Sequence, residues 1–168
     1  MKLFVPKNFQ PPKLLKVDDF RIRPLTVRDC DLDYQAMVSS VNIIKKVRGE
    51  TSCHSTWPST KFTRKENQQD LIKMEADFKA KRAFNYTIMN RQETEALGSI
   101  YLFPIDLYYP KETDKYDVDF SMWVTQKAYD QGLYPVLFNV VIGWIKTVWP
   151  WDFNRVKIRN AEVPQMIE

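Results

Sequence analysis

The chain has 168 residues, of which 44% are hydrophobic and 14% aromatic, so it can bury the core of one compact domain. No apolar run approaches the roughly 20 residues that span a bilayer, and the proline-rich start is unlike a secretory signal, so we expect a cytoplasmic protein without membrane contact. The net charge of +4 comes from basic residues dispersed among 21 acidic ones, which argues against nucleic-acid binding but suits polyanionic small molecules.

The cysteine and histidine content argues against a metal centre or a disulfide framework. Two cysteines, Cys30 and Cys53, and one histidine, His54, show no CxxC or related ligand spacing. We therefore expect no metal site, and we expect Cys30 to pack as a small hydrophobic residue.

The chain divides into an N-terminal segment, residues 1–19, and a single domain, residues 20–168. The first segment holds three prolines and little periodicity. These features predict an extended arm laid over the domain, or a loosely ordered terminus.

Three segments of the domain carry clear helix or strand signals. Phe20–Leu25 alternates apolar and basic residues and predicts a strand near a sheet edge, because Pro24 cannot donate to a ladder. Thr26 and Asp29 indicate the start of a helix. The capping box Thr63–Glu66 begins a charged, mostly solvated helix. The helix that starts at Thr26 and Asp29 is expected to bury one face, which carries Tyr34, Met37, Val38 and Val41.

Lys45–Phe62 is rich in serine and threonine and predicts a loop or a broken helix. Within it, His54 and Trp57 could shape a substrate pocket. In the alternative interpretation Trp57 fills the core and His54 is solvated.

The second half of the chain predicts mainly strands. Ala83–Asn90 and Leu97–Phe103 read as an antiparallel hairpin, the first as a half-buried strand. The connection Ile105–Tyr116 is longer than usual, which indicates a functional or mobile loop. Arg155–Arg159 predicts a final short strand, and the last residues, AEVPQMIE, resemble the opening of a helix.

The strand Asp117–Val124 separates two kinds of side chain. One face is apolar and is predicted to be core, at Val118, Phe120, Met122 and Val124. The other face carries polar chemistry, at Asp117, Asp119, Ser121 and Trp123.

A polar loop, Thr125–Gln131, and Gly132 precede a long amphipathic helix. Apolar residues recur there at three- and four-residue steps, as on one buried face, at Leu133, Val136, Leu137, Val140, Val141, Trp144, Ile145 and Val148. Pro135 falls in the first turn, where its missing N–H costs nothing. Unpaired main-chain donors and the helix dipole predict a candidate anion site at Gln131, Gly132, Leu133 and Tyr134.

The order strand, helix, helix, three strands, helix, strand and helix start resembles the GNAT superfamily of acyl-CoA-dependent N-acyltransferases. In that family the strand before the long helix often reads acidic, apolar, small, x, x, Val, and a loop R/Q-G-x-G-x-G/A follows. Here Asp119–Val124 (DFSMWV) matches the strand, and Tyr129–Tyr134 (YDQGLY) stands at the loop position. The stretch WPSTKFTRKENQQDL also resembles one branch of small bacterial GNAT proteins. The resemblance extends from about Phe20 to Glu168.

The resemblance implies a three-layer α+β fold, with a central mixed sheet flanked by helices, and acetyl-CoA as co-substrate. The main chain around Met122, Trp123 and Val124 would hold the pantetheine arm and polarise the thioester carbonyl. The residues Gln131–Tyr134 would hold the diphosphate, and Asn160 would lie beside the cofactor.

The resemblance also implies candidate catalytic residues. An attacking amine must be neutral, so a carboxylate must take its proton, and Asp119 stands where the family often places this base. Ser121 could orient a water molecule. The alternative for Asp119 is a strand-surface carboxylate paired with a lysine or arginine.

The chain departs from the family pattern in two ways. Only Gln131 and Gly132 fit the loop, because Tyr129, Asp130 and Tyr134 replace its other conserved types. Side chains there could obstruct the diphosphate, and Asp130 would repel it if it pointed into the site. Family members also continue with a full helix and one or two strands beyond the point where this sequence ends, so the family's late tyrosine acid cannot be named here.

The leading hypothesis is an acetyl-CoA-dependent N-acetyltransferase acting on a small-molecule or peptide amine of unknown identity. The alternative is a catalytically inactive GNAT-like module that binds a CoA-type ligand or another protein. A nucleic-acid binder rests on the pI of about 9.0 alone. Exposed aromatic residues such as Tyr108, Tyr109 and Trp151 make a homodimer plausible.

Overall fold

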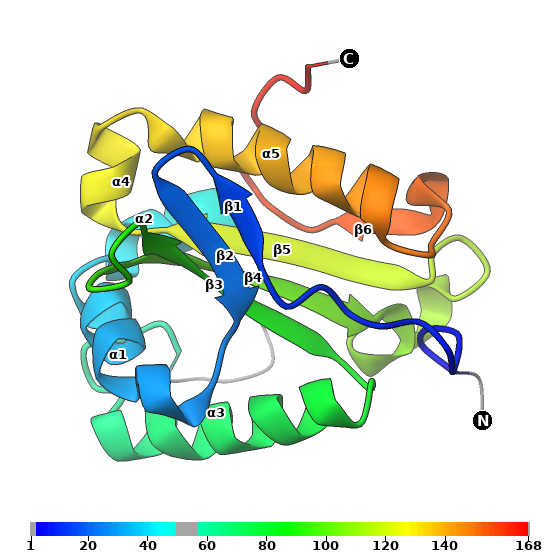
Figure 1. Cartoon of the computed structure of the whole chain (residues 1–168), viewed down its shortest axis with the longest axis horizontal. Helices are drawn as coiled ribbons and strands as arrows, with labels where there is room; N and C mark the ends of the chain where they lie inside the picture. Colours follow the sequence, from blue (N-terminus) through cyan, green and yellow to red (C-terminus); the bar gives the residue numbers. More distant parts are fainter. Residues whose placement is uncertain (1–2, 50–56, 168) are drawn as a thin grey trace.

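The fold is built on one six-stranded sheet, shown by a computed structural model that describes residues 3–49 and 57–167 (Figure 1). The strands lie in the order of the chain, and neighbours are antiparallel except for the parallel last pair. They are β1 (Leu15–Val17), β2 (Phe20–Pro24), β3 (Phe84–Asn90), β4 (Ala96–Pro104), β5 (Val118–Val124) and β6 (Val156–Ile158).

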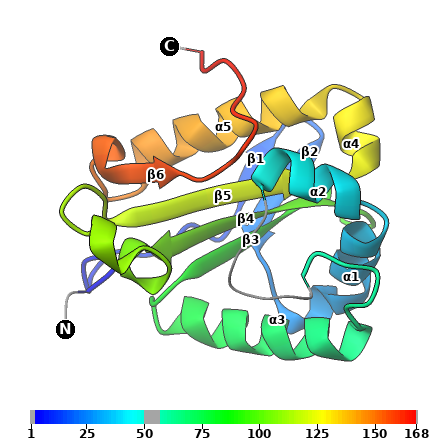
Figure 2. The same ribbon diagram turned by 180° about the vertical axis from the view of Figure 1, so that it is seen from behind.

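Helices cover both faces of the sheet, which confirms the predicted three-layer α+β architecture (Figures 1 and 2). The long α5 lies on one face, and α1, α2 and α3 lie on the other. The helices are α1 (Cys30–Val38), α2 (Val41–Arg48), α3 (Arg64–Lys79), α4 (Gln126–Asp130) and α5 (Leu133–Val148). Short 3-10 turns occupy Val27–Asp29, Ile105–Leu107, Pro110–Glu112 and Phe153–Arg155.

The main hydrophobic core contains buried residues of the sheet and of the helices on both of its faces. The ring of Phe138 on α5 packs against Phe120 of β5, with 6.0 Å between ring centroids. The buried face of α5 is rotated from the predicted one, because Val136 and Val148 are 52% and 44% exposed. The buried residues of this helix are instead Tyr134, Leu137, Phe138, Val141, Ile142, Trp144 and Ile145.

Several local predictions were wrong. A short helix, α4, replaces the polar loop expected after β5, whereas the segment 45–62, expected to be a loop or broken helix, agrees with the structure in its described part, because α2 ends at Arg48 and residues 57–62 form turns and bends. Thr125 caps α4 by accepting a hydrogen bond from the amide of Ala128. The expected helix after Asn160 does not form within 161–167. The strand β3 is buried on both faces, where half-burial was expected.

Residues of the N-terminal segment lie across the domain rather than apart from it. Val5 is buried, and β1 pairs with β2. The ring of Phe4 stacks on Phe84 of β3 and packs against Trp151. Trp151 is therefore half-buried within the chain, so the aromatic exposure on which a homodimer was based is reduced.

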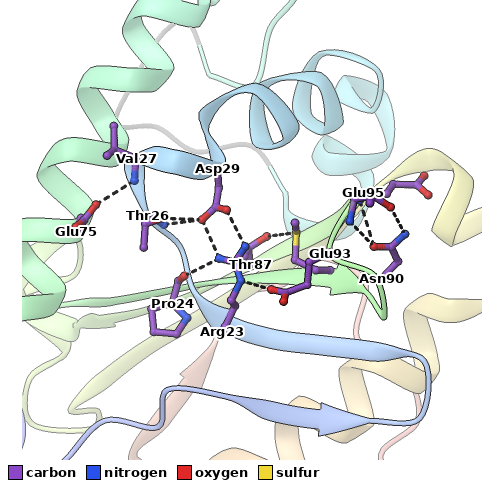
Figure 3. Close-up of polar contacts among 12 residues, drawn as sticks. Arg23, Pro24, Thr26, Val27, Asp29, Glu75, Thr87, Asn90, Glu93 and Glu95 are labelled. Carbon is purple, nitrogen blue, oxygen red and sulfur yellow. Dashed lines mark hydrogen bonds and ion pairs between the residues drawn. The ribbon is translucent and has the colours of Figure 1, made fainter.

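A polar network ties β2 to the first helices (Figure 3). The Arg23 guanidinium donates two hydrogen bonds to the carboxylate of Asp29, at 2.8 and 2.9 Å, and also pairs with Glu93. Glu75 of α3 accepts a hydrogen bond from the amide of Val27 at 3.0 Å. Bidentate charged bonds are among the stronger ones, so this network fixes where α1 begins.

The parallel strands β5 and β6 pair over three residues and then diverge, and we call this diverging arrangement the fork. Pairing covers only Val118–Phe120 on β5 and Val156–Ile158 on β6, after which the strands separate. On the other side of β5, Gly98 of β4 lies so close that a Cβ there would be 2.1 Å from the carbonyl oxygen of Trp123. Only glycine permits this approach, which holds β5 in its place between β4 and the fork.

Candidate functional site

The face of β5 opposite α5 carries the predicted polar residues. Phe120, on the alternate face, packs on α5, so Asp119, Ser121 and Trp123 point toward α1, α2 and α3. The predicted division of this strand into an apolar and a polar face is therefore confirmed. The antiparallel register places Ser99, Tyr101 and Phe103 of β4 opposite these three residues.

Asp119 lies in a buried cluster with two arginines. Its side chain is 0% exposed, and Nη2 of Arg159 lies 3.1 Å from its Oδ2 atom. This ion pair lacks hydrogen-bond geometry, and neither carboxylate oxygen has a hydrogen-bond partner among the described residues. Burial raises the pKa of Asp119, while the charges of Arg159 and Arg48 oppose the rise.

Ser121 accepts hydrogen bonds from both arginines. Nε of Arg48 lies 3.1 Å from its hydroxyl oxygen, and Nη2 of Arg159 lies 3.3 Å from it. The predicted catalytic pair, Asp119 and Ser121, therefore shares Arg159 as a partner. Arg48 is the last residue of α2, in a segment expected to be a loop or a broken helix, and nothing in its sequence context marked it as a site residue.

A cavity of about 340 Å³ lies between α3 and the polar face of the sheet. Its wall includes Asp33 of α1, Asn85 of β3 and Tyr101 of β4, together with Arg48 and Arg159. Asp119 and Ser121 are not part of this wall. The rim on α3 carries Glu66, Asp70 and Asp77 together with Lys73, which pairs with Asp77 at 2.6 Å.

Asp33 is a buried carboxyl on the cavity wall. It is 7% exposed and accepts hydrogen bonds from Nδ2 of Asn67, at 3.0 Å, and from the hydroxyl of Ser99, at 3.3 Å. Burial raises its pKa to about 6, despite these two bonds. The sequence analysis missed Asp33, because one acidic residue on a helix is normally solvated.

Asn85 is a buried amide without a partner. Its side chain is on the cavity wall, the residue is 1% exposed, and neither its oxygen nor its nitrogen has a hydrogen bond among the described residues. Buried side-chain amides are normally paired, so this one marks a position where a ligand group could bind. The alternation of β3 placed Asn85 on a strand but gave no sign of the cavity.

Trp57 packs at the edge of the same cavity. Its ring lies 6.3 Å from that of Tyr101 and 6.5 Å from that of Trp123, and the Arg48 guanidinium lies 4.9 Å from its ring centre. Trp57 therefore lines this cavity and also packs against the hydrophobic core, and its part in substrate binding stays a prediction. Its predicted companion, His54, lies outside the described residues.

The fork between β5 and β6 is bridged by Asn160. Its side-chain oxygen accepts from the amide of Met122 at 3.0 Å, and its Nδ2 donates to the carbonyl of Met122 at 2.9 Å and to the hydroxyl of Tyr134 at 2.8 Å. The Tyr134 hydroxyl donates to the carbonyl of Glu162 at 2.5 Å, and the amide of Glu162 donates to the carbonyl of Val47. The chain after β6 thereby runs between α5 and α2 (Figure 2).

The predicted anion site is only partly available. The amides of Gln131 and Gly132, expected to be free, donate to the carbonyls of Lys127 and Tyr129, because α4 takes the place of an open loop. Leu133 and Tyr134 form the first turn of α5, where amides have no acceptor within the helix. Asp130 is exposed and accepts a hydrogen bond from Gln126, so it points along the surface of α4.

Among residues 3–49 and 57–167, no three histidine, cysteine or acidic side chains come together as metal ligands, and Cys30 is buried with a free thiol. No described helix has the length and apolar character needed to cross a bilayer.

Comparison with known proteins supplies structural relatives only. No protein-family model matches the chain, and no curated protein matches its sequence. It is similar to ribosomal-protein-S5-alanine acetyltransferase from Vibrio fischeri (13% identity, TM-score 0.58, 80% of this chain and 67% of that one). It is also similar to RimL, a ribosomal L7/L12 α-N-protein acetyltransferase in complex with coenzyme A (12%, 0.56, 80% and 68%). A third is the microcin C7 self-immunity acetyltransferase MccE, in complex with acetyl-CoA and AMP (15%, 0.56, 79% and 67%). The chain therefore has the fold of the GNAT acetyltransferases.

Proposed function

We propose that the chain is an acetyl-CoA-dependent N-acetyltransferase that acts on a primary amine. The observation that carries this proposal is the cavity of about 340 Å³ on the polar face of the sheet in a GNAT fold. Its volume falls in the usual range for small-ligand sites, and its wall combines aromatic and carboxyl side chains. The structural relatives RimL and MccE, with coenzyme A and acetyl-CoA, add support.

We place the acetyl-CoA at the fork between β5 and β6, along the main chain of Met122–Val124. The residues present fit the molecule only in part. The first-turn amides of α5 at Leu133 and Tyr134 suit a diphosphate, whereas those of Gln131 and Gly132 are already paired. Binding along Met122 would also require Asn160 to give up its two bonds to that residue.

A second candidate is a catalytically inactive GNAT-like module. The side chains of Asn160 and Tyr134 span the fork, which favours this alternative directly. An inactive module would show no acetyl transfer to any amine and weak or no binding of acetyl-CoA.

Acetyl-CoA binding separates the two candidates. At a hundred times the dissociation constant, a specific ligand adds about 2.7 kcal/mol to the free energy of unfolding. For a chain of this length that raises the melting temperature by about 5–10 °C. An unchanged melting temperature at millimolar acetyl-CoA would remove the acetyltransferase proposal.

The sequence-predicted base is tested by Asp119→Asn. If Asp119 takes the proton of the amine, this variant loses turnover by about a hundredfold or more and binds acetyl-CoA as before. The exposed Asp114→Asn serves as the control. Unchanged turnover in Asp119→Asn would exclude the base role, while a parallel loss of melting temperature would indicate a structural one.

A further inference from the structure

The cavity on the polar face presents two features that the apolar core does not explain. One is the buried carboxyl of Asp33, and the other is the unpartnered amide of Asn85. Both lie on the wall of the same cavity, whereas the Asp119 carboxylate lies behind Arg159 and is absent from the wall.

The sheet register relates the two groups. Asn85 is opposite Tyr101 and Thr87 is opposite Ser99, so Asn85 and Ser99, the partner of Asp33, stand in adjacent rows on one face of the sheet. Rows two residues apart on a strand are separated by about 7 Å. That spacing suits a small molecule with two polar groups separated by a few carbon atoms.

The chemistry of each group selects one part of the ligand. An ionised carboxyl with two neutral donors, Asn67 and Ser99, has no cationic partner within hydrogen-bond distance, so it favours an ammonium group. On the rim of α3, Glu66 and Asp70 add acidic groups to the same opening, whereas Asp77 there is paired with Lys73 and Arg82. The amide of Asn85 offers one acceptor and two donors and so favours an uncharged polar group, such as a carboxamide or hydroxyl.

The basic residues of the wall, Arg48, Lys73 and Arg159, are engaged with other groups, and Lys73 pairs with Asp77. Arg159 pairs with Asp119, and the Arg48 guanidinium lies 4.9 Å from the ring of Trp57 and 4.8 Å from that of Tyr101 while its Nε donates to Ser121. Their charges would nevertheless favour an anionic ligand, so the experiment includes one.

We propose that the cavity binds a small primary amine with its ammonium group at Asp33 and an uncharged hydrogen-bonding group at Asn85. This inference deepens the proposed function and rests on it for one point only. In the acetyl transfer, Asp33 rather than Asp119 would take a proton from the bound ammonium, giving a neutral amine and a carboxylic acid.

The binding part is tested by calorimetric titration of the intact protein without acetyl-CoA. The probes are β-alaninamide, with both groups; butylamine, with the ammonium only; propionamide, with the amide only; and β-alanine, with a carboxylate in place of the amide. We expect β-alaninamide to bind about tenfold more tightly than butylamine, and the other two to bind more weakly. Equal or tighter binding of β-alanine, or no binding of any probe below about 10 mM, would overturn the proposal.

Two variants locate the groups. Asp33→Asn should weaken both ammonium probes about tenfold or more, whereas Asp31→Asn, an exposed residue of the same helix, should change neither. Asn85→Leu should abolish the preference for β-alaninamide over butylamine. It should also raise the melting temperature by about 2–4 °C, because it removes an unpaired buried amide. Unaltered probe affinities in Asp33→Asn and Asn85→Leu would contradict the assignment.

The pH dependence of the affinity for butylamine separates a binding role of Asp33 from a purely structural one. Groups facing Asp33 include Asp29, Cys30 and Tyr101, and burial holds the pKa of Asp33 at about 6. The affinity for butylamine should therefore be constant above pH 7 and fall as the pH drops below 6. In Asp33→Asn this fall should vanish; a fall that persists would exclude Asp33.

Failure of this inference differs from failure of the proposed function. If acetyl-CoA does not bind but the amines do, the cavity assignment holds and the transferase proposal fails. If acetyl-CoA binds but no amine binds at Asp33, the cavity assignment fails and the transferase proposal stands. Turnover of β-alaninamide by Asp33→Asn and Asp119→Asn then identifies the proton acceptor, since the variant lacking it should show the larger loss.

Discussion

Asp33 on the cavity wall lowers the stability of the fold at neutral pH, where it provides the ionised carboxylate proposed to bind the ligand. Asp33 is buried with only neutral hydrogen-bond donors, so its ionised form is disfavoured in the folded chain and its pKa is raised from 3.8 to about 6. A carboxyl whose pKa is higher in the folded than in the unfolded chain makes the fold more stable at low pH than at neutral pH. As the pH rises, this carboxyl ionises in its buried position, and the free energy of unfolding falls.

This cost can be measured by urea unfolding of the wild type and of Asp33→Asn. In the wild type, Asp33 contributes to the free energy of unfolding below about pH 4, and this contribution is lost as the pH rises through 6. The free energy of unfolding therefore falls by about 2 kcal/mol between pH 4 and pH 7. The variant has no such titration, so it should gain stability relative to the wild type by that amount over the same range. A difference between the two proteins that is independent of pH would contradict the raised pKa.

At this scale the sequence predicted the residues of β5 better than those of the cavity. Asp119, Ser121 and Trp123 could be assigned to one face because strand alternation is local. Asp33 and Asn85 could not be grouped, because they meet only through the packing of α1 against β4 and the pairing of β3 with β4. Neither contact leaves a mark in spacing or composition.

Elements with long periodic patterns were predicted, as were the short strands β2 and β6, whereas β1 and α4 were missed. The hairpin of β3 and β4, the capped start of α3 and the long α5 were all expected, because each has many residues in one pattern. The five-residue α4 was not, since its cap at Thr125 is followed by too few residues for a helical period. That helix matters, because it takes the amides of Gln131 and Gly132 out of the predicted anion site.

The fork between β5 and β6 depends on one side chain, which Asn160→Ala tests. The substitution leaves the amide and carbonyl of Met122 without their partner and removes the hydrogen bond that the Tyr134 hydroxyl accepts, while that hydroxyl still donates to Glu162. Each unpaired buried group costs about 1–3 kcal/mol, so we expect a loss of about 2–4 kcal/mol in the free energy of unfolding. Chemical denaturation measures it, with the exposed Asn154→Ala as the control. A loss no larger than that of the control would show that the bridge contributes little.

The whole molecule follows from the order of its elements more than from any motif. The order of strands and helices carried the resemblance that implied the three-layer fold, and the amphipathic pattern of α5 indicated that this helix packs on the sheet. The path of the chain after β6 was not predictable. It is set by contacts of Glu162 with Val47, Tyr129 and Tyr134, which join segments far apart in sequence.

Two functions therefore depend on the same fork. As an acetyltransferase, the protein must exchange the bonds of Asn160 with Met122 for bonds to acetyl-CoA. As an inactive module, it would keep them. The two states differ in the surroundings of Met122–Val124 and of the chain after β6.

A two-dimensional NMR spectrum of the isotope-labelled protein, recorded during titration with acetyl-CoA, distinguishes these states. We expect the amide signals of Met122, Val124, Leu133 and Tyr134 to shift together and to saturate, and those of residues 161–167 to shift with them as the chain after β6 is displaced. If these signals stay unchanged at millimolar acetyl-CoA, the fork is closed to the co-substrate and the acetyltransferase proposal is wrong.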